Sequence, residues 1–241
     1  MSVAIITGGS RGFGLALGRS LAADGWHLVI DAREATSLTS AADDLRARGA
    51  ASVTALPGDV GDPSHRADLI AAAVALGGID LLVNNASVLG PSPQPRLAEY
   101  PLDVLADVYR VNVIAPLGLI QLALEPLRQS CGVVVDITSD AGAEGYEGWG
   151  GYGSSKAALE QLSNVLAAEE PSLRIYWFDP GDMRTQMHQE AFPGEDISDR
   201  PEPESVVPAL RQLLASGRPS GRYKASDPLA EQPAEFAAAR Q

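Results

Sequence analysis

The alternation of short apolar runs with longer amphipathic segments is the feature that most constrains how this chain folds. Short apolar runs predict strands buried on both faces, at residues 3–6, 27–31, 52–56, 79–83, 132–138 and 173–178. Segments with apolar residues at helical spacing separate these runs, at residues 13–25, 35–48, 62–76, 101–128 and 152–169. Strands that alternate with helices imply a parallel sheet covered on both faces. The predicted fold class is therefore α/β, a doubly wound parallel sheet of the Rossmann type.

Two prolines and a polar C-terminal third refine this prediction. Pro116 and Pro126 are expected to bend or end the long helix at 101–128, because proline cannot donate a helical hydrogen bond. The C-terminal third predicts a lid at about 182–204, a helix at 203–216, a short final strand at 221–226 and a loosely ordered tail at 227–241.

The composition fits one domain and disfavours several classes of protein. A chain of 241 residues that is 45% hydrophobic can bury a sizeable core as a single domain, residues 1–241. A net charge of -13 disfavours nucleic acid as a partner. One cysteine, Cys131, allows no intrachain disulfide and favours the cytoplasm. We expect no signal peptide, no membrane span and no metal site, since the apolar runs are short and no His or Cys pair has ligand spacing.

The stretch TGGSRGFG, residues 7–14, joins the first predicted strand to the first predicted helix. Its glycines, Gly8, Gly12 and Gly14, permit a tight turn and a close approach to a phosphate. The helix that follows offers free N–H groups and a positive dipole end to an anion. The same residues also fit G-x-S-x-G, in which Ser10 would be the nucleophile of a hydrolase.

The rest of the chain favours the nucleotide hypothesis over the hydrolase. A hydrolase of that type needs an acid and then a histidine later in the chain. Of the three histidines, His27, His65 and His188, only the last falls at a suitable distance, and no orienting motif surrounds it. Ser10 also follows the first strand, whereas a nucleophile elbow usually follows several.

Polar or glycine-rich residues follow nearly every predicted strand. Ligands of such sheets bind beyond the carboxyl ends of the strands, so these residues predict a single crevice. They are residues 7–14, 31–33, 59–60, 84–87, 139 and 179–185.

The sequence YGSSK places Tyr152 and Lys156 four residues apart at the start of a predicted helix. Residues at this spacing share a helix face, so a phenol and an ammonium would project side by side into the crevice. A nearby cation favours the ionised phenol and lowers its pKa from about 10. The tyrosine would then be usable as an acid or a base near neutral pH.

Six motifs in this order resemble those of the short-chain dehydrogenase/reductases: TGGSRGFG, NNAS, YRVN, ITS, YGSSK and PGDMRT. The resemblance spans roughly residues 1–225. It implies that Tyr152 donates a proton to a substrate carbonyl, or accepts one in the reverse direction. Lys156 would bind the nicotinamide ribose and lower the pKa of the tyrosine, Ser139 would hold the carbonyl oxygen, and Asn112 would position a water.

The resemblance also implies a nicotinamide dinucleotide bound along the crevice. Its pyrophosphate would lie on the glycine loop, its adenine at Asp59 and its carboxamide beside Pro180, with Asn84 bracing the sheet. The residues implied to bind the cofactor are Gly8, Ser10, Arg11, Gly12, Phe13, Gly14, Asp31, Arg33, Asp59, Val60, Asn85, Ala86, Tyr152, Lys156, Pro180, Gly181 and Thr185.

The signals for the type of dinucleotide conflict. An acid after the second strand usually binds a free ribose, and an arginine binds a 2′-phosphate. Asp31 falls one residue before the acidic position typical of NAD enzymes, where Ala32 stands. Arg33 and Arg11 fall where NADP enzymes often carry a base. NADP(H) is therefore favoured, with NAD(H) as the alternative.

The sequence leaves the substrate and the assembly less defined. The substrate is expected to be a small carbonyl compound or alcohol, with Tyr146 and Trp149 as candidate walls of its pocket. Ser87 stands where the family commonly has glycine and is expected to change a loop and not the chemistry. By analogy with the family, the helices at 101–128 and 152–169 would form a homodimer or homotetramer. A non-catalytic NADP(H) sensor on the same fold stays open as an alternative.

Overall fold

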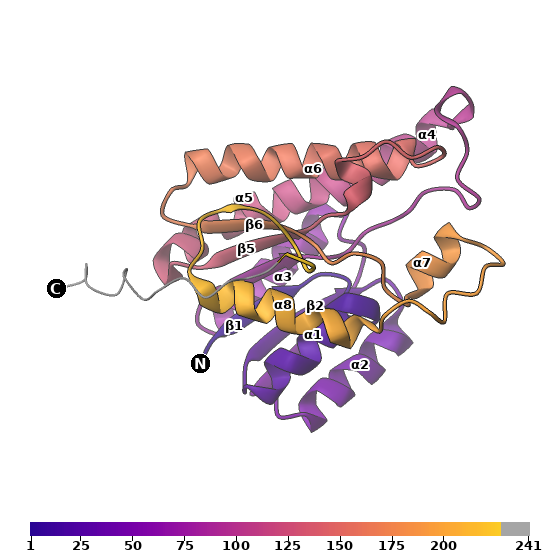
Figure 1. Ribbon diagram of the computed structural model, residues 1–241. Helices are drawn as coiled ribbons and strands as arrows, with labels where there is room; N and C mark the ends of the chain where they lie inside the picture. The colour runs from indigo at the N-terminus through magenta and orange to yellow at the C-terminus, as the bar shows by residue number, and fades with distance from the viewer. Residues whose placement is uncertain (228–241) are drawn as a thin grey trace.

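The computed structural model describes residues 1–227 and builds them around a seven-stranded sheet (Figure 1). The strand order is β3-β2-β1-β4-β5-β6-β7, and each neighbouring pair is parallel. The strands are β1 (Val3–Ile6), β2 (His27–Ala32), β3 (Ser52–Pro57), β4 (Leu81–Asn84), β5 (Val133–Ile137), β6 (Arg174–Asp179) and β7 (Gly221–Lys224). The prediction of a doubly wound parallel sheet is confirmed, and the strands lie within about two residues of their predicted places.

Helices cover both faces of the sheet. They are α1 (Gly12–Ala23), α2 (Ala35–Ala47), α3 (Pro63–Ala75), α4 (Leu102–Tyr109), α5 (Ala115–Ser130), α6 (Gly150–Glu169), α7 (Gln186–Ala191) and α8 (Pro203–Ser216). One core packs α1, α2 and α8 against the sheet, and the other packs α3 and α5. Strand β1 supplies both cores, because Ala4 and Ile6 enter the first while Val3 and Ile5 enter the second.

The prediction of one long helix at 101–128 is wrong. The segment divides into α4, a π-helical turn at Arg110–Ile114, and α5. Pro116 lies in the first turn of α5, where its missing N–H removes a hydrogen bond to the preceding turn. Pro126 lies inside α5, which continues past it to Ser130. Only the first of these two prolines therefore marks a change of helix.

The predicted lid contains a short helix. Helix α7 lies between β6 and α8, and Figure 1 shows it set apart from the two helical layers. The tail predicted at 227–241 lies, apart from Asp227, outside the described residues. None of the helices in residues 1–227 is both long and apolar enough to cross a bilayer.

The strand order reverses between β1 and β4, and this reversal positions the site. The chain leaves β1 toward β2 and β3 on one side, and leaves β4 toward β5 and β6 on the other. The connections that follow β1 and β4 therefore run to opposite sides, and a crevice is left beyond the carboxyl ends of these strands.

Candidate active site and cofactor groove

A cavity of about 1200 Å³ runs along the carboxyl ends of the strands. It brings together most of the predicted site residues, although they come from seven separate segments of the chain. The predicted residues that line it are Gly8, Ser10, Arg11, Gly12, Phe13, Asp31, Arg33, Asp59, Val60, Asn85, Ala86, Ser139, Tyr152, Lys156, Pro180, Gly181 and Thr185. Gly14, Asn84 and Asn112 lie behind this lining, in the supporting structure.

The glycine loop forms a cradle that side chains would fill. Gly8 and Gly12 have φ values of 65° and 55°, which other residues rarely adopt. A Cβ at Gly14 would lie 2.5 Å from Nδ2 of Asn85 and 2.7 Å from the carbonyl oxygen of Gly8. Helix α1 begins here, and its N-cap residue, Arg11, makes no side-chain capping hydrogen bond. The exposed helix N-terminus and the close backbone approach fit a pyrophosphate.

The loops after β1 and β4 are tied together by hydrogen bonds. The hydroxyl of Thr7 accepts from the backbone N–H groups of Asn85 and Ala86, both at 3.0 Å. Nδ2 of Asn85 donates to the carbonyl of Thr7 at 2.8 Å. Asn84 instead donates to the buried carboxylate of Asp136 at 2.7 Å and thereby braces β4 against β5.

Asp31 is oriented by two partners at the end of β2. Its Oδ1 accepts from the N–H of Gly8 at 2.7 Å, and its Oδ2 lies 3.0 Å from Nε2 of His65. The Asp31 carboxylate raises the pKa of the His65 ring, although partial burial of the ring opposes this. Arg33 is exposed on the cavity wall two residues further along. Sequence reasoning missed the role of His65, because its partner lies 34 residues earlier in the chain.

Asp59 has a cationic neighbour at the predicted adenine end. NH1 of Arg110 donates to Oδ2 of Asp59 at 3.1 Å, and the N–H of Gly61 donates to Oδ1 at 2.8 Å. Although burial opposes it, these two donors hold the pKa of Asp59 below its usual value. Arg110 lines the cavity and was not predicted, although it lies in the YRVN motif. The sequence signal that could have found it is its place in that motif, two residues before Asn112.

Tyr152 and Lys156 project from the first turns of α6 into the cavity. The tyrosine is 8% and the lysine 2% exposed, so both are nearly removed from water. Burial, together with the charges of Asp179 and Asp140, raises the pKa of Tyr152. Burial lowers the pKa of Lys156 to about 8. Both shifts favour the neutral form of the side chain, as desolvation does in general. The predicted lowering of the Tyr152 pKa by the neighbouring lysine is therefore wrong for the chain by itself, because burial outweighs it.

Ser139 follows β5 and faces the same part of the cavity. Its Oγ donates to Oδ1 of Asp140 at 2.9 Å and accepts from the N–H of Ala141 at 3.2 Å. The hydroxyl of Tyr146 donates to Oδ2 of Asp140 at 3.1 Å. Asp140 therefore fixes the orientation of the Ser139 hydroxyl and adds a negative charge beside it.

Asn112 lies within the π-helical turn, and both the oxygen and the nitrogen of its side-chain amide are hydrogen-bonded to neighbouring segments. Its Oδ1 accepts from the N–H of Val88 at 2.9 Å and from Oγ of Ser87 at 3.1 Å. Its Nδ2 donates to the carbonyl of Val88 and to Oγ of Ser155. Because these contacts satisfy the amide group, a water at this place would have to be held by other atoms.

Ser87 lies between two of the predicted catalytic residues. Its hydroxyl donates to Oδ1 of Asn112 at 3.1 Å, and its proximity to the Tyr152 phenol lowers the pKa of that phenol, against the larger effect of burial. The expectation that Ser87 changes a loop and not the chemistry stays a prediction.

The end of the cavity beyond Tyr152 is apolar and aromatic. The Trp149 ring meets the Tyr152 ring edge-on at a centroid distance of 5.8 Å, and the Phe192 ring lies 5.8 Å from it on another side. Met187 of α7 packs against the same cluster. Trp149 thus lines the cavity, as predicted, whereas Tyr146 does not. The lid contributes to this end of the cavity through α7.

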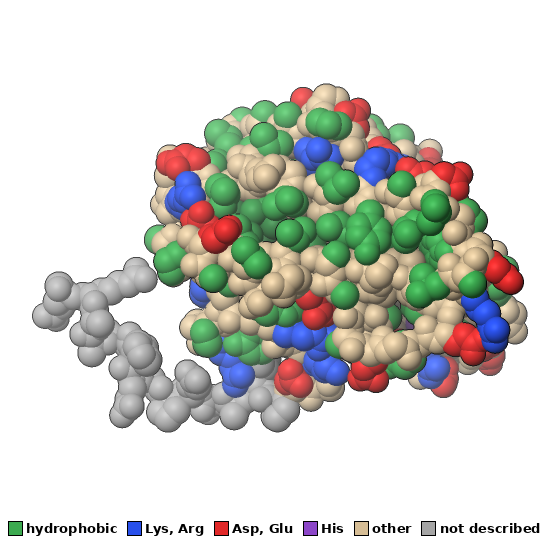
Figure 2. Space-filling view, turned by 90° about the horizontal axis from the view of Figure 1, so that it is seen from above, with side chains coloured by type: hydrophobic (Ala, Val, Ile, Leu, Met, Phe, Trp, Pro, Cys, Tyr) green, Lys and Arg blue, Asp and Glu red, His purple; other side chains and the backbone are tan. Residues whose placement is uncertain are grey.

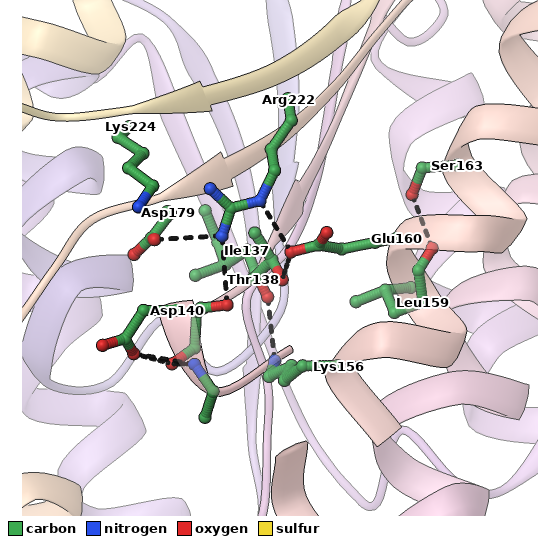
Figure 3. Close-up of polar contacts among 12 residues, drawn as sticks. Ile137, Thr138, Asp140, Lys156, Leu159, Glu160, Ser163, Asp179, Arg222 and Lys224 are labelled. Carbon is green, nitrogen blue, oxygen red and sulfur yellow. Dashed lines mark hydrogen bonds and ion pairs between the residues drawn. The ribbon is translucent and has the colours of Figure 1, made fainter. Parts of the chain in front are cut away.

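A charged network joins the carboxyl ends of β5 and β6 to β7 and α6 (Figure 3). NH2 of Arg222, on β7, donates to the carbonyl of Ser139 at 3.2 Å and to Oδ2 of Asp179 at 3.1 Å. Its Nε donates to Glu160 of α6 at 3.0 Å. The other oxygen of Asp179 accepts from the N–H of Gly181, at 3.0 Å. Arg222 thereby links the backbone of the serine to the loop after β6.

The three histidines have partners other than Ser10. Nδ1 of His27 is bonded to Oγ of Ser52 at 2.7 Å, and His65 is bonded to Asp31. Nδ1 of His188 lies 3.7 Å from Oδ1 of Asp182, and its ring packs against Phe192. Across the described part of the chain, the geometry thus provides no histidine base for a serine nucleophile. Residues 1–227 contain no group of three His, Cys, Asp or Glu side chains arranged to hold a metal ion.

Comparisons with known proteins agree with this architecture. The short chain dehydrogenase family model matches residues 2–196. Mouse (Mus musculus) sepiapterin reductase is 32% identical over 222 residues, which cover 87% of this chain and 84% of that protein. Rabbit (Oryctolagus cuniculus) dehydrogenase/reductase SDR family member 4 is 34% identical over 225 residues, 90% of this chain and 82% of that protein.

Solved structures with bound dinucleotide share the fold. An alcohol dehydrogenase from the archaeon Thermococcus sibiricus, complexed with 5-hydroxy-NADP, has a TM-score of 0.83 and 28% identity, covering 93% of this chain and 95% of that one. A short chain dehydrogenase from Shigella flexneri 2a, complexed with NADP, has a TM-score of 0.87 and 28% identity, covering 94% and 97%. The chain belongs to the short-chain dehydrogenase/reductase family of oxidoreductases.

Proposed function

We propose that this protein is an NADP(H)-dependent reductase of small carbonyl compounds, with Tyr152 as its acid and base. The observation that carries this proposal is a single cavity that joins the glycine cradle to Tyr152, Lys156 and Ser139. A dinucleotide with its pyrophosphate at the start of α1 would extend toward these side chains.

The bound cofactor would supply a hydride to the carbonyl carbon of the substrate. Ser139 would turn its hydroxyl away from Asp140 and donate a hydrogen bond to the carbonyl oxygen. Tyr152 would give its phenolic proton to that oxygen as negative charge develops there. In the alcohol-oxidising direction, the ionised phenol would accept the same proton. Lys156 would favour the ionised phenol through its positive charge, since its Nζ lies 5.4 Å from the centre of the Tyr152 ring.

NADP(H) is preferred over NAD(H) on the geometry of the groove. Each oxygen of Asp31 already accepts from one protein donor, Gly8 or His65, which leaves this carboxylate with fewer acceptor sites for a ribose hydroxyl. Arg33 and Arg11 both line the cavity, and Arg11 donates to the side chain of Gln186, so either arginine would be available to pair with a 2′-phosphate. The structural relatives complexed with NADP are consistent with this preference.

The substrate pocket supports a compound with an apolar or ring-shaped body. Trp149, Met187 and Leu89 form an apolar cluster with Tyr152 where such a body would pack. Asp140, Asp182 and Glu190 also line the cavity, and their negative charge disfavours an anionic substrate.

We further propose that two copies associate through the face formed by α5 and α6. Figure 2, viewed from above Figure 1, shows hydrophobic side chains gathered in a band across this face. Ile114 of the π-helical turn, Leu122 of α5 and Val165 of α6 are 56%, 46% and 43% exposed, which is high for large apolar side chains. Burial of this band would give a homodimer, and a second interface would give a homotetramer. The cytoplasmic location expected from the single cysteine stays a prediction.

Binding and turnover together test the proposed enzyme against the alternative of a sensor. NADPH and NADH would be titrated into the purified protein by nicotinamide fluorescence, followed by a screen of ketones and aldehydes. We expect Tyr152→Phe to keep NADPH affinity and to lose carbonyl reduction by at least about 100-fold. Binding without turnover of any carbonyl compound would favour the sensor, and binding of neither dinucleotide would overturn both.

A further inference from the structure

The pairing of Asp31 with His65 places a titratable cation behind the wall of the cofactor groove. Asp31 lines the cavity, whereas His65 reaches its carboxylate from the buried side, from the first turn of α3. Gly58 makes this approach feasible, because a Cβ there would lie 2.4 Å from Nδ1 of the His65 ring. The contact is thus built into the backbone of the β3–α3 loop as well as into the two side chains.

We propose that His65 is a positioning residue for cofactor choice, which supplies the positive charge that allows a 2′-phosphorylated dinucleotide to bind beside Asp31. This inference rests on the proposed function, since it concerns the same groove. An unpaired carboxylate at the end of β2 would repel a 2′-phosphate and would accept a hydrogen bond from a free ribose hydroxyl. By pairing with Asp31, His65 reduces both the repulsion of a 2′-phosphate and the attraction of a ribose hydroxyl. It does so without touching the cofactor itself.

The bonding of the carboxylate supports this role. Oδ1 of Asp31 is held by the N–H of Gly8 at 2.7 Å and Oδ2 by Nε2 of His65 at 3.0 Å, so both oxygens are turned toward protein donors. The Asp31 side chain is 2% exposed, which strengthens the field of a nearby charge. Arg33 then remains on the cavity wall as the group that would meet the phosphate.

The other charged groups around His65 favour its protonated form. Asp62 precedes α3 and Asp68 lies on it, and both raise the pKa of the ring together with Asp31. Arg66, the neighbouring cation, donates NH1 to the carbonyl of Val60 at 2.8 Å and lies against Gly118 of α5. As the pH rises through the raised pKa of His65, the ring loses its charge and Asp31 is left as an uncompensated anion.

His65→Gln tests the proposal, because glutamine can still donate a hydrogen bond to Asp31 but carries no charge. Affinities for NADPH and NADH would be measured by fluorescence titration. We expect NADPH binding to weaken about 10-fold, the order of effect of one partly screened neighbouring charge, with NADH binding changed less than about 2-fold. His27→Gln is the matched control. The His27 ring is bonded to Ser52 and lies at the start of β2, at the opposite end of that strand from Asp31. The affinities for NADPH and NADH should therefore stay unchanged.

Two further measurements separate charge from structural support. The double variant Asp31→Asn, His65→Gln removes both charges and should recover NADPH affinity to within about 3-fold of wild type. In the wild-type protein, the ratio of NADPH to NADH affinity should fall as the pH rises above 7, where a phosphate monoester of pKa near 6 is already dianionic. That fall should be lost in His65→Gln. The pH series on the wild-type protein tests the proposal even if a variant fails to fold.

The outcomes distinguish this inference from the proposed function. If wild type binds neither dinucleotide, the proposed function fails. If wild type binds NADPH but His65→Gln weakens both dinucleotides equally, His65 only supports the glycine loop and the inference is overturned. An unchanged affinity ratio in His65→Gln, or a pH-independent ratio in wild type, would overturn it as well.

Discussion

The ammonium of Lys156 donates to the carbonyl oxygen of Ile137 at 2.8 Å, on the last residue of β5. This contact holds the lysine beside the Tyr152 ring. Because the ammonium is buried, its pKa is lowered to about 8, so its charge titrates within the range in which enzymes are assayed.

The first prediction concerns that charge. Below pH 8 the ammonium is protonated and favours the ionised phenol, and above pH 8 it becomes neutral and this effect is lost. We expect kcat/KM for alcohol oxidation to stop rising with pH, or to decline, above about pH 8. In Lys156→Arg the guanidinium keeps its charge, so the profile, normalised to its own maximum, should continue to rise. If kcat/KM of Lys156→Arg also stops rising near pH 8, the limit does not come from the titration of Lys156.

The second prediction concerns Asp140, whose charge raises the pKa of the already buried Tyr152. Asp140→Asn removes that charge and keeps an oxygen that can accept from Ser139. Ionisation of the phenol then becomes easier, so the rise of kcat/KM for alcohol oxidation should move to lower pH. The control is Asp43→Asn on α2, where the carboxylate pairs with Arg46 on the surface, and its profile should match wild type. A profile of Asp140→Asn that stays in place would count against this view.

The third prediction concerns the network in Figure 3. Arg222 compensates the charge of Asp179, which also raises the pKa of Tyr152. Arg222→Met should therefore move the oxidation profile to higher pH, opposite in direction to Asp140→Asn, and lower kcat about 10-fold by releasing the Ser139 carbonyl. Arg222→Lys keeps the charge and should restore the position of the profile. A loss of kcat with no change in the profile would indicate a purely structural role.

Much of the fold could be predicted from the sequence because it rests on local patterns. Runs such as Val3–Ile6 are apolar at each position, as strands between two helical layers must be. Within 101–128, Pro116 predicted a change of helix near the start of α5, but no local pattern predicted the π-helical turn before it. Asn112 in that turn bonds Val88 and Ser155, contacts that become visible only once the segments are folded together.

The candidate site, like the fold, was predicted where local motifs specify it and was missed where distant segments meet. Tyr152, Lys156 and the glycine loop lie in short motifs, so sequence spacing predicted them. Arg222 acts on Ser139 across 83 residues of chain, and no local pattern distinguishes it from a surface arginine. Asp31 was predicted to contact the cofactor, but the sequence contained no indication that Gly8 and His65 would occupy both of its oxygens.

The fourth prediction concerns the glycine cradle. Gly14→Ala would place a methyl group 2.5 Å from Nδ2 of Asn85, so the loop or the asparagine has to move. We expect a loss of about 1–3 kcal/mol in the free energy of unfolding, together with weaker binding of both dinucleotides. Urea denaturation and fluorescence titration measure these effects. Gly145→Ala is the matched control, since a Cβ at that position would meet no described atom within 4 Å, and it should behave as wild type.

The last prediction concerns the apolar band on α5 and α6 in Figure 2. Leu122→Glu would bury a carboxylate in the proposed interface, where an unpaired charge costs about 3–5 kcal/mol. That cost corresponds to a Kd weakened by a factor of at least about 100, enough to give monomers at micromolar concentration. Sedimentation velocity would measure the mass. Thr39→Glu on α2, across the sheet, should leave assembly unchanged. Leu122 is 46% exposed in the single chain, so an interface on this face would have to bury residue 122. If the Leu122→Glu oligomer is as stable as that of wild type, the interface lies on another face.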